Sequence, residues 1–173
     1  MEVYKPEIKK FLGHKVRVIT VGLELYIVIQ DVFEALGRLD NKNQITSRDR
    51  KRLNEFLEII GKSSDSTKCT ITSKSKKSKS RETQEVSCIP VELLPVITTQ
   101  FKPTNSKYKT KEENEQILNE WAEFMIWVDN LLQEHKAYEI ILKDKEEQKS
   151  IAKTITEETD GKMVVINTQI SII

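Results

Sequence analysis

Three groups of lysine and arginine residues carry the chemistry that this sequence makes most visible. The first group lies in "CTITSKSKKSKSRETQEVSCI", residues 69–89, where serine and lysine separate two β-prone runs. Lysine and arginine neutralise phosphates and release counterions, and serine hydroxyls donate to phosphate oxygens. The tract therefore predicts either a basic finger that binds a polyanion or a solvated loop, since exposed loops use the same residues. Its candidate nucleic-acid-binding residues are Lys74, Lys76, Lys77, Lys79 and Arg81.

The second and third basic groups lie before and after this tract in the sequence. In "NKNQITSRDRKRLNEFLEIIGK", residues 41–62, the apolar residues Leu53, Phe56, Leu57 and Ile60 recur at helical spacing, and Gly61 ends the pattern. We expect the opposite face of this helix to bind nucleic acid. It carries Arg48, Arg50, Lys51 and Arg52, and a later basic loop holds Lys102, Lys107, Lys109 and Lys111.

Catalytic and metal-binding patterns are missing from the sequence. "IIGKSS" resembles a phosphate-binding loop, but that motif needs a glycine where Phe56 stands. There is no Gly-x-Ser-x-Gly elbow and no Cys-x-x-Cys pair, and His14 and His135 are far apart. We therefore expect no catalytic residues, no metal site and no cofactor, and a chain that is not an enzyme.

Cys69 and Cys88 lie in segments that could pair as a hairpin, where the two side chains could face each other. No run approaches the roughly 20 apolar residues that span a bilayer, and the first residues lack the apolar centre of a signal peptide. The sequence thus predicts a cytosolic protein and no membrane partner. In that reducing compartment, the cysteines are expected to be buried thiols without a disulfide.

The elements that must position the basic groups combine strands and helices. "KVRVITV" and "LELYIVI", separated at Gly22, predict one hairpin, and residues 69–72 with 85–89 predict a second. "QDVFEALG" predicts a short helix that stops at Gly37. These patterns indicate an α+β domain with small antiparallel hairpins.

A long helix should organise the core of this domain. Thr110 and Glu113 form a capping-box pattern at its start. Its apolar residues step by three and four, which predicts one broad buried face. They are Ile117, Trp121, Phe124, Met125, Val128, Leu131 and Leu132.

Charge and pattern both change towards the end of the chain. Residues 62–81 hold seven basic residues and one acidic residue, whereas residues 112–160 hold fourteen acidic and five basic residues. We expect one domain over residues 1–135 and an extension over residues 136–173, made of a helix and a β-prone terminal strand. An unpaired strand of that kind favours pairing with this domain or with a second copy of the chain, and we expect a homo-oligomer.

Two stretches of the chain resemble a known family. "KVRVITVGLELYIVIQDVFEALG" resembles the opening of phage antirepressor amino-terminal domains and of the related Bro-N domain, and Val32, Ala35, Leu36 and Gly37 match its signature. "TQEVSCIPVELLPVITTQFKP" followed by "ILNEWAEFMIWVDNLL" is similar to the later part of those domains. The resemblance covers residues 11–135, and its second part includes Leu94, Pro95, Trp121 and Trp127.

The resemblance implies a bacteriophage protein in the cytoplasm of the bacterial host. It would regulate transcription in lysis and lysogeny control, by binding DNA, a phage repressor or both. Our first hypothesis is a regulator that holds double-stranded DNA through the basic helix and the hairpin tip. The alternative is an antagonist that captures a phage repressor or a host regulatory or defence protein through its terminal strand and does not bind DNA. Salt-sensitive DNA binding separates the two.

Overall fold

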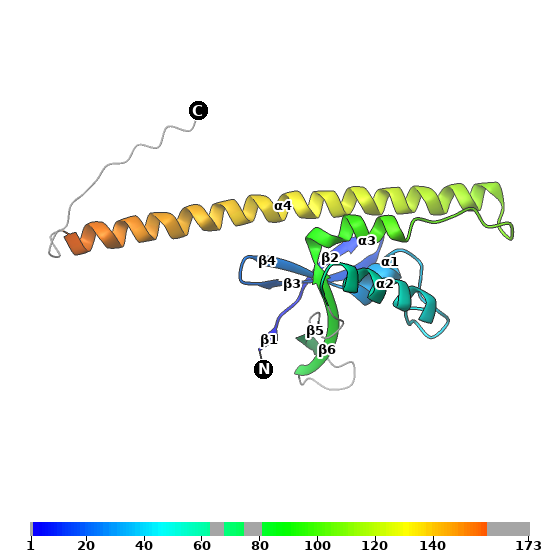
Figure 1. Cartoon of the computed structure of the whole chain (residues 1–173), viewed down its shortest axis with the longest axis horizontal. Helices are drawn as coiled ribbons and strands as arrows, with labels where there is room; N and C mark the ends of the chain where they lie inside the picture. The colour runs from blue at the N-terminus through cyan, green and yellow to red at the C-terminus, as the bar shows by residue number, and fades with distance from the viewer. Residues whose placement is uncertain (1, 63–67, 75–80, 159–173) are drawn as a thin grey trace, which may run out of the picture. The chain divides into compact units, whose positions relative to one another are not determined.

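The structure is a computed structural model that describes residues 2–62, 68–74 and 81–158 (Figure 1). The chain divides into two units, residues 1–133 and 134–173, which are treated separately. The described elements are β1 (Val3–Tyr4), β2 (Glu7–Phe11), β3 (His14–Val21), β4 (Glu24–Val28), α1 (Ile29–Ala35), α2 (Ser47–Ile59), β5 (Lys68–Lys74), β6 (Arg81–Pro90), the 3-10 helix η2 (Val91–Leu93), α3 (Leu94–Gln100) and α4 (Lys111–Glu158). This confirms the expected α+β class.

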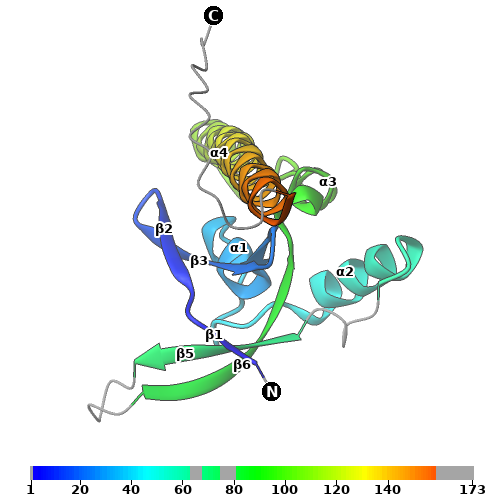
Figure 2. The ribbon, with the colours of Figure 1, turned by 90° about the vertical axis from the view of Figure 1, so that its left-hand side faces the viewer.

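The strands form one six-stranded sheet in the order β1-β5-β6-β4-β3-β2. Only the β1–β5 pair among these is parallel. β6 joins the two halves of the sheet, because it pairs with β5 up to Ser87 and with β4 from Cys88 onward. Figure 2 shows β6 curving as it passes from one partner to the other.

Tight turns explain the hairpins on either side of β3. Gly22 has a φ of 62° between β3 and β4, as its position between two β-branched runs predicts. The β2–β3 turn uses Leu12 and Gly13, both at positive φ (43° and 85°), which is the backbone of a two-residue hairpin loop. The first hairpin is therefore confirmed, and β2 extends it by a strand that the sequence analysis did not assign.

The second hairpin is also present, but its cysteines differ from the expectation. Cys69 lies opposite Val86 in the β5–β6 ladder, so Cys88 is its diagonal neighbour, with a Cα–Cα distance of 6.5 Å. That separation is within the range that a disulfide can bridge, and the structure joins the two residues by a disulfide. The prediction of two free thiols was wrong: the inferred reducing compartment was given more weight than the cross-strand proximity that the hairpin implied.

α4 supplies the centre of the main core through the part that belongs to the first unit. Phe124 and Val128 are fully buried, as the helical spacing predicts. The Phe124 ring packs edge-on against Phe11 at 5.1 Å and stacks with Trp127 at 5.5 Å. At the helix start, Thr110 N donates to Glu113 and Glu113 N donates to the Thr110 hydroxyl, which is the expected capping box.

In the second unit, α4 continues as a helix to Glu158, so the predicted helical extension is confirmed. The predicted terminal strand lies outside the described residues. No helix in the described part of the chain has the length and apolar character needed to cross a membrane.

Candidate nucleic-acid interface

α2 begins and is held in place through buried polar contacts. The Thr46 hydroxyl accepts from the backbone N of Asp49 at 3.2 Å, which caps the helix. Leu53 and Leu57 bury one stripe of α2. Asp49, which is buried beside them, accepts two hydrogen bonds from the Arg38 guanidinium, at 3.1 Å and 2.8 Å. A bidentate pair of this kind restricts rotation of α2 about its own axis.

The four predicted cations of α2 are all exposed, but they do not share one face. At about 100° per residue, Arg48 and Lys51 point away from the buried stripe, whereas Arg50 and Arg52 lie on its two opposite edges. Lys51 forms an exposed pair with Glu55 at 3.8 Å. Within the described part of the chain, Arg48 and Arg50 form no ion pair. We refer to these four side chains as the α2 basic residues.

Arg52 leans towards an aromatic ring at one edge of α2. Its guanidinium lies 5.4 Å from the centre of the Phe101 ring, and Arg38 lies 5.1 Å from the same ring. Such contacts hold a guanidinium in place without neutralising it. Arg52 is therefore both positioned and charged.

Arg50 lies at the other edge, in a groove of about 450 Å³ between β6, α1 and the loop before α2. Side chains that can form hydrogen bonds dominate its wall. Its polar members are Arg17, Gln30, Gln44, Arg50, Gln84, Glu85 and Ser87, and we call it the carboxamide groove.

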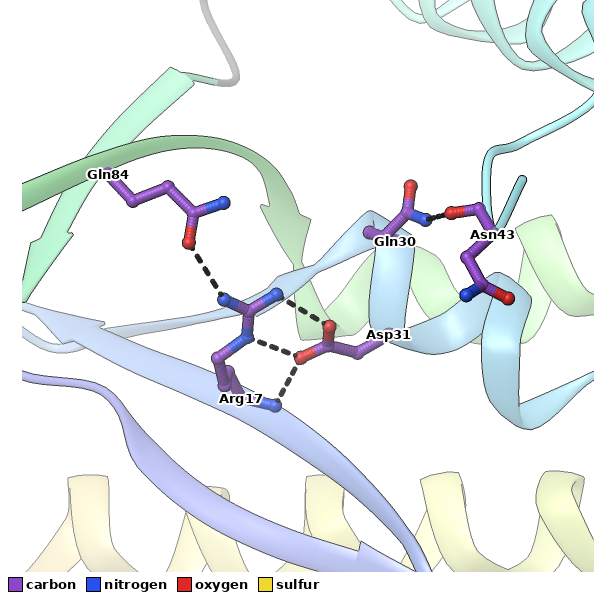
Figure 3. A network of polar contacts seen from close by, with 5 residues as sticks. All are labelled: Arg17, Gln30, Asp31, Asn43 and Gln84. Atoms are coloured by element: carbon purple, nitrogen blue, oxygen red, sulfur yellow. Dashed lines mark hydrogen bonds and ion pairs between the residues drawn. The ribbon is translucent and has the colours of Figure 1, made fainter. Parts of the chain in front are cut away.

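Arg17, which lines this groove, forms an ion pair with the buried Asp31 (Figure 3). Asp31, at the start of α1, accepts three hydrogen bonds from Arg17 of β3: from the backbone N (2.8 Å), from Nε (2.8 Å) and from Nη2 (2.7 Å). The hydrogen bond to Asp31 raises the pKa of Arg17 above its usual value. Arg17 Nη1 reaches Gln84 of β6 at 3.5 Å, so one arginine connects β3, α1 and β6.

The glutamines of the groove were missed by the sequence analysis. Gln30 Nε2 donates to the backbone oxygen of Asn43 at 2.5 Å, while the Gln44 side chain has no hydrogen-bond partner among the described residues. Gln30, Gln44 and Gln84 come from three elements with no local motif in common. No spacing rule could have found this set before the β4–β6 pairing was known.

The predicted hairpin tip is only partly described. The backbones of Lys74 and Arg81 form the last pair of the β5–β6 ladder. Lys76, Lys77 and Lys79 lie outside the described residues. Their contribution to a nucleic-acid surface therefore stays a prediction.

The four lysines of the third basic group each lie in a different local environment. The Lys102 ammonium lies 5.6 Å from the centre of the Trp121 ring, and Lys107 lies 5.1 Å from that of Tyr108. Lys111 pairs with Glu115 along α4 at 3.7 Å. Lys109 lines a separate hollow of about 480 Å³.

That second hollow carries opposed charges. Arg38, Lys109 and His14 share its wall with Glu34 and Glu120. The two carboxylates make it a poor site for a polyanion. Among the described residues, no three His, Cys, Asp or Glu side chains gather where they could hold a metal ion.

No family model matches the chain, and neither the curated proteins nor the solved structures contain a match. The fold class and the geometry above therefore define the candidate site on their own.

Proposed function

We propose that the chain is a non-enzymatic regulator of gene expression that binds double-stranded DNA through the α2 basic residues. The observation that carries the proposal is a firmly held, solvent-facing helix with four exposed cations, of which Arg48 and Arg50 have no ion-pair partner in the described part of the chain. Unneutralised cations on a rigid element attract phosphates and release counterions.

The dimensions of α2 suit this role. Its 13 residues extend about 20 Å, which exceeds the width of the DNA major groove, so side chains along α2 can reach phosphates at the groove edge. Figure 2 shows α2 standing to one side of the sheet, away from the β2–β3 hairpin. Arg48 and Lys51 would contact phosphates, and Arg52, held over Phe101, would contact the flanking backbone.

Regulation would follow from occupancy of the DNA. The resemblance to phage antirepressor amino-terminal domains supports a role in lysis and lysogeny control. Under the alternative, an antagonist of a phage repressor or host protein, the chain would have no affinity for DNA. The two proposals therefore give opposite results in one titration.

The test is fluorescence anisotropy of a labelled mixed-sequence duplex, titrated with the full chain at about 50 mM and 200 mM salt. We expect binding that weakens with salt and falls about tenfold or more in the double variant Arg48→Glu/Lys51→Glu. The matched control, Lys145→Glu/Lys149→Glu in the second unit, changes the net charge equally and should bind almost as well as the parent chain. Equal losses in both variants would assign the effect to net charge and remove α2 as the site.

A further inference from the structure

The carboxamide groove differs in charge from the outer face of α2. The charge of Arg17 is neutralised by Asp31, and Glu85, which also lines the groove, pairs with Lys68 at 3.5 Å. Arg50 is then the one lining cation without a carboxylate partner in the described part of the chain. A ligand would be recognised here mainly by hydrogen bonds, because one net charge is a weak signal for phosphate alone.

The groove offers hydrogen-bond donors and acceptors to a ligand. Gln44 offers both its amide nitrogen and its oxygen, since neither has a partner in the described residues. Gln84 accepts weakly from Arg17 and keeps its amide nitrogen available. Glutamine binds the N6 and N7 atoms of adenine through such a pair, and arginine binds O6 and N7 of guanine.

The backbones that carry these glutamines are fixed before any ligand binds. The Gln44 N donates to Asp40 Oδ1 at 2.9 Å, and the Gln44 oxygen accepts from Asp40 N at 2.8 Å. The Gln30 side chain ties the same loop to α1 through Asn43, as Figure 3 shows. Gln84 sits in the β5–β6 ladder opposite Ile71. The fixed backbone limits the positions that these side chains can reach, which favours discrimination between ligands.

We propose that the carboxamide groove reads the edge of a purine base in DNA that α2 holds, with Gln44, Gln84 and Arg50 as the residues that determine specificity. This inference rests on the proposed function. It divides the work between neighbouring surfaces: Arg48, Lys51 and Arg52 bind phosphates, whereas the side chains of Gln44, Gln84 and Arg50 contact the base edge.

The experiment starts with selection from a library of short duplexes with a randomised centre, using the full chain. We expect the enriched duplexes to share at least one base pair in a fixed orientation. Inverting that base pair, which moves its purine to the other strand, should weaken binding about tenfold. In Gln44→Ala/Gln84→Ala, this discrimination should disappear, while affinity for a scrambled duplex stays within about twofold. Gln100→Ala, an exposed glutamine of α3, is the matched control and should retain full discrimination.

The outcomes separate the inference from the function on which it rests. DNA binding without any enriched position overturns base reading and leaves the DNA-binding function standing. Unchanged discrimination in the double variant shows that bases are read elsewhere, and an equal loss on both duplexes shows that the groove only supports the fold. Absence of binding to every duplex overturns the proposed function and the inference together.

Discussion

Asp31→Ala should destabilise the first unit strongly, because it removes the centre of a buried network. The Asp31 side chain is 6% exposed and accepts all three of its hydrogen bonds from Arg17. Without it, the Arg17 guanidinium stays between β3 and β6 and has only the 3.5 Å contact to Gln84. A charge is then left without its partner in a partly buried site.

The size of the effect follows from how well Arg17 is hydrated. Removing one member of a buried pair costs about 3–5 kcal/mol of the free energy of unfolding. The Arg17 side chain is 26% exposed, so water can solvate it in part, and we expect the lower end, about 3 kcal/mol. Arg17→Met leaves Asp31 charged and nearly dry, which should cost about 4 kcal/mol.

Urea unfolding followed by tryptophan fluorescence measures these values. Trp121 and Trp127 both belong to the first unit, so the signal reports the unit that contains the pair. The double variant Arg17→Met/Asp31→Ala should lose less than the sum of the losses in the two single variants, since it leaves no unpaired charge.

A control and two results decide whether this reasoning holds. Glu34→Ala, an exposed acidic residue of α1, should change the free energy of unfolding by less than about 0.5 kcal/mol. A loss below about 1 kcal/mol for Asp31→Ala, or strict additivity of the two single changes, would refute a coupled buried pair.

Three further outcomes can be checked with the same protein. Phe124→Ala should lower the free energy of unfolding by about 3–5 kcal/mol because Phe124 is fully buried. Ile126 is 64% exposed, so Ile126→Ala should lower it by less than about 1 kcal/mol. Similar losses in the two variants would contradict the position of α4 in the core. Reduction of the Cys69–Cys88 disulfide, which spans 19 residues, should cost about 3 kcal/mol in a urea titration with and without dithiothreitol, and two thiols that react under native, oxidising conditions would contradict the bridge. A hydrogen bond to Glu24 raises the pKa of Tyr26 from 10.0 to about 12, so this contribution to stability is complete below pH 10 and is lost as pH rises towards 12; an ultraviolet titration should show a late tyrosine that Tyr26→Phe lacks.

The parts of the fold that could be predicted depend on local signals. Gly22 between two β-branched runs defines the β3–β4 hairpin, and Thr110 with Glu113 marks the start of α4. β2 gives no comparable signal: "EIKKF" is mostly charged, and its strand exists because it pairs with β3. Leu12 at positive φ is likewise imposed by that pairing, since leucine has no intrinsic preference for this region.

Only part of the candidate site could be predicted, because the rest depends on contacts between residues far apart in the sequence. Composition shows the α2 basic residues, but the distinction between Arg50 and Arg52 depends on where β6 and Phe101 lie. Arg17 and Asp31 are 14 residues apart on different elements, and Gln84 is 67 residues from Arg17. Contacts between distant residues are set by sheet order, which one sequence does not display.

The salt dependence of DNA binding tests the central proposal most directly. If two to four of the α2 basic residues neutralise phosphates, the logarithm of the binding constant for a mixed-sequence duplex should fall with the logarithm of salt concentration with a slope of about −2 to −4. Lysines of the hairpin tip would make the slope steeper, and Arg48→Glu/Lys51→Glu should make it shallower by about 2. Absence of binding at low salt, or a slope that these two changes leave unaltered, would contradict DNA binding through α2.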